Sequence, residues 1–308
     1  MNVAIIIVTY NGISWLSTCL DSCGIIPVIV VDNNSSDNTV AFIKENYPKV
    51  TLIEATENKG FGAANNIGIA KALEIGAEYF FLLNQDAYLQ PNTISRLIEC
   101  HKENTSFGIL SPIHLNGDWS KLDYNFSKYI TENKQFQYDS IKLKYNQNCY
   151  EFSFINAAGW LLSKEAIDTI GGFDPLFFHY AEDNNYCQRL LFHGLKIGVV
   201  PDVFLAHDRE YKTNTAKPDT HKKLQLEERK IKVSLADINK DLNSQLQAFK
   251  KKYSNNIRKS LLQLKWSDYA YHKKAQKLVT ELLPDIKKSR AINQKKGRHY
   301  IETTDASQ

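Results

Sequence analysis

The stretch YFFLLNQDAYL, residues 79–89, joins an apolar run to three consecutive polar side chains. Its first half, YFFLL, predicts a short strand that is buried on both faces. The run ends in Asn84, Gln85 and Asp86, so a carboxylate directly follows core residues. An Asp at such a place commonly stabilises a turn while water solvates its charge. The rest of the chain determines whether Asp86 has a further role.

Strand-like and helix-like patterns alternate through the first hundred residues. The expected strands cover residues 3–9, 28–31, 50–53 and 79–83, and the expected helices cover 14–23, 40–47, 63–75 and a segment from Pro91. This alternation predicts an α/β fold with a mainly parallel sheet and right-handed crossovers. Such sheets bind ligands beyond the carboxyl ends of their strands. Polar residues stand at three of these ends: Thr9-Tyr10-Asn11, Asp32-Asn33 and Asn84-Gln85-Asp86. Their convergence at one edge favours a functional Asp86 over a simple turn.

The second half of the chain divides into a core part and a tail. Residues 107–152 have weaker periodicity and β-hairpin character, whereas 154–162 and 195–207 return to core-like patterns. Beyond Tyr211 the sequence is helical, Lys-rich and poor in Gly. We therefore expect two parts, a catalytic domain over 1–211 and a basic helical region over 212–308.

The net charge of +4 hides a strong asymmetry between these parts. Residues 212–308 hold 23 Lys/Arg and 10 Asp/Glu, whereas residues 1–211 hold 15 and 24. Two interpretations of the basic tail are open. It lies on an anionic membrane surface as a peripheral contact, or it is a solvated or homodimer-forming appendage. The acidic body and the lack of aromatic platforms in the basic stretches argue against binding of nucleic acid.

The sequence predicts a cytoplasmic location. The sequence contains no run of 18 apolar residues, so we expect no transmembrane helix. The N-terminus, MNVAIIIVTYNG, resembles a first strand and lacks the basic region and cleavage site of a signal peptide. Five scattered Cys fit reduced thiols better than a disulfide framework or a zinc site.

An ordered set of motifs resembles the family 2 glycosyltransferases of the GT-A fold, especially bacterial rhamnosyltransferase-like enzymes of surface polysaccharide assembly. The motifs are VTYN, VVDNNSSDNT, ENKGFGAANNIG, LLNQDAYL, GGFDPLFFHYAEDNNYCQR and AHD, within residues 1–210. The resemblance implies a Rossmann-like, mixed and mainly parallel sheet flanked by helices, with a C-terminal helical extension. It also implies an inverting transfer from a UDP- or dTDP-sugar to a hydroxyl of a growing glycan, free or lipid-linked.

The resemblance assigns the donor side of the site. Asp32 would accept a hydrogen bond from N3–H of uracil or thymine, and the ring of Tyr10 would stack on the base. The alternatives are a helix cap for Asp32 and an ordinary strand-end Tyr10. The loop ENKGFGAANNIG opens a helix whose N-terminus favours phosphate, with a purely structural turn as its alternative. The remaining donor residues would be Thr9, Asn11, Asn33, Asn58, Gly60, Asn65, Asn84 and Gln85.

The resemblance also implies a divalent cation, Mg²⁺ or Mn²⁺. Asp86 stands at the last position of the family's DxD motif, whose carboxylate binds the ion on the diphosphate. Asn84 replaces the first Asp, which weakens the expected affinity because one carboxylate remains. His207 matches a family histidine that follows the last strand, and a core or surface histidine is the alternative. Hard cations of this kind complete their shell with phosphate oxygens and water.

The pair Glu182-Asp183 matches the family's ED motif, and Asp183 would be the general base. The alternative for Asp183 is the N-cap of the following helix. Asn185 stands where the family has a second acid, so a helper role at that position is in doubt. The acceptor side would comprise Asn156, Gly159, Trp160 and Glu182, although a core position for Trp160 fits equally well.

A nucleotidyltransferase acting on sugar phosphates is the rival enzyme. That class also places an acidic strand end beside a nucleotide. It usually carries an N-terminal Gly-rich loop with a basic residue, and VTYNGISWL contains no Lys or Arg.

Overall fold

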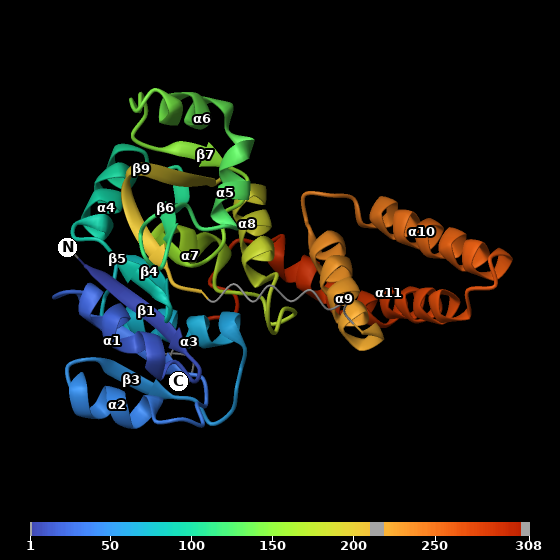
Figure 1. Ribbon diagram of the computed structural model, residues 1–308, viewed down its shortest axis with the longest axis horizontal. Coiled ribbons are helices and arrows are strands. Elements are labelled where there is room, and N and C mark those ends of the chain that lie inside the picture. The colour runs from blue at the N-terminus through green and yellow to red at the C-terminus, as the bar shows by residue number, and fades with distance from the viewer. Residues whose placement is uncertain (1, 210–218, 303–308) are drawn as a thin grey trace.

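The computed structural model describes residues 2–209 and 219–302. Within these residues the chain forms a nine-stranded sheet with helices on both faces, followed by three long helices (Figure 1). The expected boundary between residues 211 and 212 lies outside the described residues. The strands are β1 (Val3–Thr9), β2 (Val28–Asp32), β3 (Thr51–Glu54), β4 (Tyr79–Asn84), β5 (Ala87–Leu89), β6 (Phe107–Asn116), β7 (Tyr150–Phe152), β8 (Gly159–Ser163) and β9 (Lys196–His207).

The sheet is mixed and mainly parallel, as predicted. Its order is β3-β2-β1-β4-β8-β6-β9-β5, and β7 pairs with β9 beside this path. Strands β1 to β4 are parallel to one another, and β6 is parallel to β9. Strand β8 runs antiparallel between β4 and β6, while β5 and β7 run antiparallel to β9. The carboxyl ends of β1, β2, β4 and β9 therefore lie along one edge.

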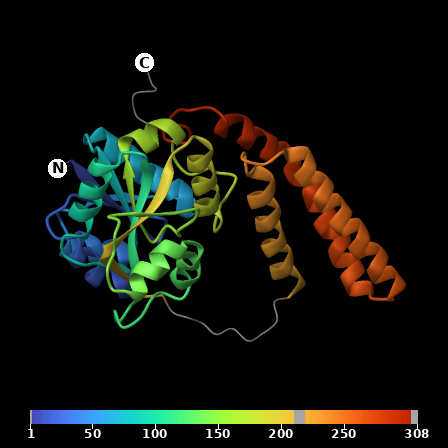
Figure 2. The same ribbon diagram turned by 90° about the horizontal axis from the view of Figure 1, so that it is seen from above.

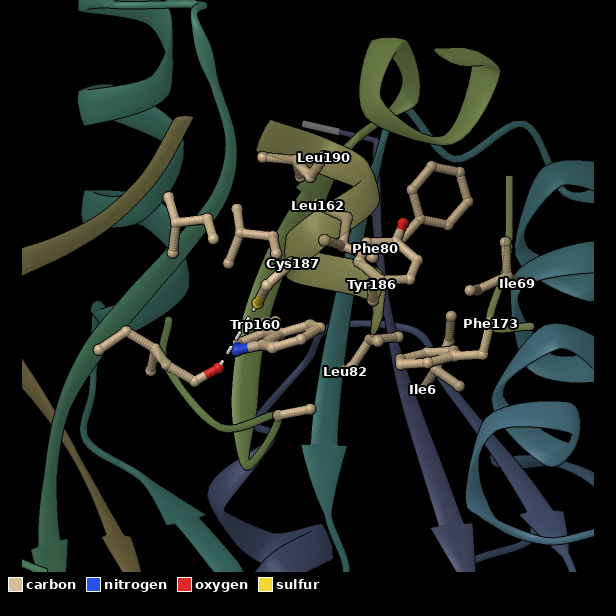
Figure 3. Packing of buried hydrophobic residues seen from close by; sticks show 14 of the residues in the cluster. Ile6, Ile69, Phe80, Leu82, Trp160, Leu162, Phe173, Tyr186, Cys187 and Leu190 are labelled. Atoms are coloured by element: carbon tan, nitrogen blue, oxygen red, sulfur yellow. Dashed lines mark hydrogen bonds between the residues drawn. The ribbon is translucent and has the colours of Figure 1, made fainter. Parts of the chain in front are cut away.

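Helices cover both faces of the sheet. Successive residues of each strand point to opposite faces, and strands such as β1 and β4 are apolar along most of their length, so both faces must be buried. Ile6 and Leu82 belong to one buried cluster, which Figure 3 shows with Trp160 and Phe173. Ile7, one residue along β1, belongs to the cluster on the other face. The helices of this part are α1 (Ile13–Ser22), α2 (Thr39–Asn46), α3 (Phe61–Glu74), α4 (Thr93–Glu103), α5 (Phe126–Tyr129), the 3₁₀ helix η1 (Ile130–Glu132), α6 (Lys134–Ile141), α7 (Lys164–Ile170) and α8 (Glu182–Phe192).

The expected hairpin character between residues 107 and 152 holds only for one short turn, where Leu115 forms an antiparallel bridge with Leu122. After β6 the chain forms α5, η1 and α6 before it returns as β7. Asp123 accepts hydrogen bonds from the backbone of Asn125 and Phe126, and Asn133 accepts one from Phe136 at the start of α6. These Asx side chains start helical turns, since they satisfy backbone donors that have no partner inside a helix.

The C-terminal region is helical, as predicted. It consists of α9 (Thr220–Ala236), α10 (Leu242–Leu262) and α11 (Trp266–Asn293), which share a small core that includes Ile231, Tyr253 and Val279. Figures 1 and 2 show α10 and α11 side by side as a hairpin that projects away from the sheet. No helix in the described part of the chain is long and apolar enough to cross a membrane.

The last described residues return to the sheet domain. The backbone N–H of Gly172 donates to the carbonyl of His299 at 2.8 Å, and Arg298 pairs with Asp168 at 2.6 Å. The Tyr300 hydroxyl lies 3.3 Å from an oxygen of the buried Asp174. The end of the predicted C-terminal region, which includes Arg298 to Tyr300, therefore packs on the predicted catalytic domain.

Candidate active site at the sheet edge

The polar ends of β1, β2 and β4 converge, as the sequence predicts. The Thr9 hydroxyl donates to Gln85 Oε1 at 2.7 Å, and the backbone N–H of Tyr10 donates to the same oxygen at 3.0 Å. The backbone N–H of Asn33 donates to the Thr9 carbonyl at 2.7 Å. Asn11 accepts a hydrogen bond from the backbone of Ser36, which fixes the loop after β2 against β1. The ring of Tyr10 remains exposed beside this network.

Asp32 holds a free acceptor inside this edge. One carboxylate oxygen accepts from the backbone N–H of Ser35 at 3.0 Å. The other, Oδ1, is buried and has no hydrogen-bond partner among the described residues. Helix α2 begins at Thr39 after Asn38, so Asp32 is not its N-cap. A buried acceptor without a partner is costly, which makes Asp32 Oδ1 a strong candidate for a ligand contact.

The loop before α3 joins the same edge. Asn33 donates to Asn58 Oδ1 at 3.0 Å and accepts from the backbone N–H of Lys59 at 2.8 Å. Gly60 has φ of +80°, and an added Cβ would overlap the carbonyl oxygen of Phe178. Only Gly therefore lets this loop approach the segment before α8 so closely.

Asn65, another predicted donor residue, lies in α3. Its side chain is buried in α3 and donates to the Phe61 carbonyl at 3.0 Å. Its exposed fraction of 1% is close to the 2% of Asp32, so Asn65 stays a prediction among the donor residues.

Asp86 and His207 meet at the ends of β4 and β9. Asp86 Oδ1 lies 3.4 Å from His207 Nε2, and Asn84 Nδ2 lies 3.4 Å from the same nitrogen. Burial raises the pKa of Asp86, but the hydrogen bond and charge of His207 outweigh it, and the pKa lies below its usual value. Asn84 Oδ1 is a second buried acceptor without a partner in the described chain. The three side chains form an acceptor-rich corner of the site.

This corner offers a cation two protein ligands. Among residues 2–209 and 219–302, no three His, Cys, Asp or Glu side chains are placed to hold an ion. The 3.4 Å between Asp86 Oδ1 and His207 Nε2 suits two neighbouring ligands of one ion with bonds of about 2.1 Å. Such an ion would take its other ligands from substrate phosphates and water. The residues fit a cation that is shared with a diphosphate.

Asp123 and Arg209 complete this corner, and the sequence did not reveal them. Arg209 Nη2 lies 2.7 Å from His207 Nδ1, and Arg209 Nε lies 3.3 Å from Asp123 Oδ2. Asp123 is fully buried, with Oδ2 3.9 Å from His207 Nδ1. Guanidinium only donates, so Nδ1 accepts from Arg209 and Nε2 carries the ring proton beside Asp86. For Nε2 to bind an ion, the proton would have to lie on Nδ1, with Asp123 in place of Arg209 as its partner. The only sequence signal was the position of Arg209 directly after AHD.

Asp183 lies in the first turn of α8. The helix begins at Glu182 after Ala181, so Asp183 is not the N-cap. Its carboxylate accepts from the backbone N–H of Asn184 at 2.8 Å and from that of Ala157. Burial raises the pKa of Asp183 to about 6, and burial with repulsion from Asp183 raises the pKa of Glu182 to about 7. A carboxylate in this range is suited to general-base catalysis near neutral pH.

Electrostatic interactions connect Asp183 to the corner formed by Asp86, His207 and Arg209. The positive charge of Arg209 favours the ionised form of both Asp86 and Asp183. At Asp183 this lowering is smaller than the effect of burial, so the pKa of Asp183 stays raised. Burial raises the pKa of Tyr129 to about 12, with a further contribution from the charge of Asp183. Tyr129, Asp183 and Arg209 therefore share one region of the site.

Of the four residues predicted to bind the acceptor, two lie in the core and two have an unpaired polar atom that could contact a ligand. Trp160 is fully buried and stacks on Phe173 with ring centroids 6.3 Å apart (Figure 3). Gly159 is buried in β8, where an added Cβ would overlap the side chain of Leu205. Both predictions of acceptor contact are corrected, because both residues are buried in the core around β8. Asn156 is half-buried with an unpaired Oδ1, and Glu182 is buried with an unpaired Oε2, within the described chain.

Comparison with known proteins places these features in a family. The sequence model of glycosyl transferase family 2 matches residues 4–171. The dTDP-rhamnosyl transferase RfbF of Shigella flexneri is 29% identical over 210 residues, which cover 67% of this chain and 69% of that protein. The N-acetylglucosaminyl-diphospho-decaprenol L-rhamnosyltransferase of Mycobacterium tuberculosis is 24% identical over 68% of this chain and 76% of its own.

Solved structures agree on the fold. S. aureus TarS 1–349 in complex with UDP-GlcNAc has a TM-score of 0.53 at 14% identity, covering 96% of this chain and 88% of that one. The mannosyltransferase PcManGT from Pyrobaculum calidifontis, in complex with GDP-Man and Mn²⁺, has a TM-score of 0.56 at 17% identity, covering 95% and 86%. The fold and family expected from the motifs are confirmed. The chain belongs to glycosyl transferase family 2 and has the GT-A fold.

Proposed function

We propose that the protein is an inverting glycosyltransferase that moves a hexose or deoxyhexose from a UDP- or dTDP-sugar to a hydroxyl of a growing surface glycan. One observation carries the proposal. The sheet edge holds an unpaired buried acceptor in Asp32 and the Asp86–His207 pair, and Asp183 on α8, a carboxylate of near-neutral pKa, interacts electrostatically with Arg209 of the same corner. These groups match the three needs of the reaction, which are base recognition, charge neutralisation and proton removal. Family membership also argues against the nucleotidyltransferase alternative.

Asp32 would select the base of the donor. Its Oδ1 can accept a hydrogen bond from N3–H of uracil or thymine, whereas N3 of cytosine carries no proton. The exposed ring of Tyr10 would stack on the same base. The name of the Shigella relative, a dTDP-rhamnosyl transferase, supports a dTDP-deoxyhexose as one donor to test.

Asp86 and His207 would hold a divalent cation on the donor diphosphate. Mg²⁺ or Mn²⁺ in this place would act as a Lewis acid that stabilises the charge of the departing nucleoside diphosphate. PcManGT, which shares the fold, was solved with Mn²⁺ and GDP-Man. Asp123 would orient the His207 ring by accepting from Nδ1–H, since ligand histidines commonly donate their second ring N–H to a carboxylate or carbonyl.

Asp183 would act as the base in a single displacement. It takes the proton of the acceptor hydroxyl as that oxygen bonds to the anomeric carbon. The bond from this carbon to the phosphate oxygen breaks on the opposite face, so the configuration inverts. With a pKa of about 6, Asp183 is mostly ionised at neutral pH but still basic enough to receive the proton. Asn156 and Glu182 would contact the acceptor.

The acceptor would be a glycan on a lipid carrier at the cytoplasmic face of a membrane. The name of the mycobacterial relative includes a decaprenol-linked substrate. The basic tail supports a peripheral contact with anionic lipid, with a homodimer through the tail as the alternative. All five Cys are free thiols, which suits a reducing compartment.

A screen of nucleotide sugars by thermal unfolding tests the proposal. With Mn²⁺ present, UDP- and dTDP-sugars should raise the melting temperature, because a ligand at 100 times its Kd stabilises the folded state by about 2.7 kcal/mol. CMP-sugars serve as the matched control and should have little effect, because N3 of cytosine carries no proton. Equal stabilisation by CMP-sugars would contradict the role of Asp32. No stabilisation by any nucleotide sugar would contradict the proposed function.

A further inference from the structure

The turn between α10 and α11 exposes a group of large apolar side chains. Leu262, Leu264 and Trp266 are 87%, 70% and 63% exposed, and the neighbouring Leu261 is exposed as well. We call residues 261–266, LLQLKW, the hairpin tip. Figures 1 and 2 place this turn at the end of the hairpin that lies farthest from the sheet. Isolated exposed apolar residues are ordinary, but a contiguous group of this kind marks an interaction site.

Basic residues line the two helices that lead to the hairpin tip, and Lys259 and Lys265 are the nearest to it in sequence. Residues 249–280 contain nine Lys/Arg and a single acidic residue, Asp268. Among the described residues, Lys252 and Lys277 are the only two of the nine that form ion pairs with a carboxylate. Four of the lysines line a hollow of about 630 Å³ between α10 and α11: Lys250, Lys273, Lys274 and Lys277. The partner of this surface must therefore offer both negative charge and an apolar phase.

We propose that the hairpin tip inserts into the interface of an anionic membrane while the flanking lysines contact lipid phosphates. Trp, Leu and Lys in this combination are typical of segments that lie at the boundary between headgroups and acyl chains. A second copy of the chain is a poorer partner, because two tips would bring the same positive charges together. The inference rests on the proposed function only for the membrane location of the acceptor.

Buried hydrogen bonds attach the base of the hairpin to the sheet domain and to α9. At the base of α11, Ser289 and Asn293 both donate to the buried Asp174 of the sheet domain at 2.6 Å. Arg290 donates to the carbonyls of Leu235 and Lys240 and so ties α11 to the end of α9. Insertion of the tip would therefore tether the sheet domain to the membrane through the hairpin, whose helix α10 of 21 residues is about 30 Å long.

Vesicle binding by the full chain tests the proposal through Trp266. Of the four Trp residues, Trp160 is buried and Trp15 and Trp119 are half-buried, so Trp266 is the exposed reporter. We expect co-sedimentation with vesicles of phosphatidylcholine and phosphatidylglycerol but not with phosphatidylcholine alone. Lipids brominated on their acyl chains should quench the fluorescence of the bound protein, and the Trp266→Phe variant should show no such quenching. Binding without any quenching of Trp266 would overturn insertion of the tip.

A pair of matched double variants separates the tip from general surface hydrophobicity. Leu262→Ser with Leu264→Ser removes two exposed apolar side chains from the tip. Ile25→Ser with Ile75→Ser removes two of similar total exposure, 103% and 53%, from the sheet domain. The tip variant should partition onto anionic vesicles roughly 100-fold more weakly, about tenfold for each buried side chain, and the control should bind like the wild type.

Three results would overturn the proposal, and each is distinct from failure of the proposed function. The first is vesicle binding by the tip variant that equals that of the wild type. The second is an equal loss of vesicle binding in the Ile25/Ile75 control. The third is a wild-type dimer that forms without lipid and is absent in the tip variant. Stabilisation by UDP- or dTDP-sugars should be the same in all variants, because the tip lies outside the sheet edge. Vesicle binding without nucleotide binding would refute the proposed function while leaving the membrane contact intact.

Discussion

Replacing Asp183 with Asn tests the assignment of the general base by two independent measurements. Asn has nearly the same shape, and its Oδ1 can still accept the hydrogen bond that the Asn184 backbone donates at 2.8 Å. The amide cannot take the proton of an acceptor hydroxyl. We expect turnover to fall about 10²–10⁴-fold, the range for a positioned general base, with unchanged affinity for the donor.

The same substitution should stabilise the folded protein at neutral pH. Burial raises the pKa of Asp183 from 3.8 to about 6, so the folded state binds this proton more tightly than the unfolded state. The stability that protonation provides is complete below the unfolded pKa and is lost as the pH rises through about 6. The full shift corresponds to about 3 kcal/mol. Because the side chain is half-buried, we expect about 1–2 kcal/mol for Asp183→Asn at pH values well above 6.

Urea unfolding of the wild type and the variant at about pH 8 and about pH 4 measures this difference, which should nearly vanish at the lower pH. Asp268→Asn is a matched control, since Asp268 also lies in the first turn of a helix but is exposed. It should change neither the unfolding free energy nor turnover. A variant with near-normal turnover, or one that is no more stable than the wild type at the higher pH, would refute the role of Asp183.

Three further changes test other parts of the molecule. Asp32→Ala removes the unpaired acceptor, and calorimetry should show affinity for UDP or dTDP falling roughly 10–100-fold; unchanged affinity would remove Asp32 from the base site. His207→Ala should abolish the Mn²⁺-dependent part of donor binding, and a normal metal dependence would disprove its role as ligand. Tyr300→Phe removes hydrogen bonds to Asp174 and Asn293 and should cost about 1 kcal/mol in urea unfolding. No loss would show that the C-terminal return adds little stability.

The parallel half of the sheet was predictable from the sequence. Strands buried on both faces must be apolar throughout, so runs such as VAIIIVT mark them with little ambiguity, and β1 covers the predicted residues 3–9. Because the carboxyl ends of such strands share an edge, the contact of Thr9 with Gln85 followed from topology. The proximity of Asp86 and His207 came from the family motifs, since β9 lies far from β4 along the chain.

Side-chain surroundings were not predictable. Trp160 suits a core and a sugar-binding cleft equally well by chemistry, and only its packing on Phe173 decides between them. Asp123 and Arg209 lie 86 positions apart in segments with weak periodicity, so no local pattern brings them together beside His207. The return of residues 294–302 to the body depends on buried partners such as Asp174, whose role appears only in three dimensions.

A transfer reaction with product analysis tests the central claim most directly. The full chain would be incubated with UDP- or dTDP-sugars, Mn²⁺ and a lipid-linked glycan primer, and NMR would report the anomeric configuration of the new glycoside. We predict a product whose configuration is inverted relative to the donor, with one UDP or dTDP released for each sugar transferred. Retention of configuration would contradict the single displacement through Asp183. Release of pyrophosphate without any new glycoside would contradict glycosyl transfer itself.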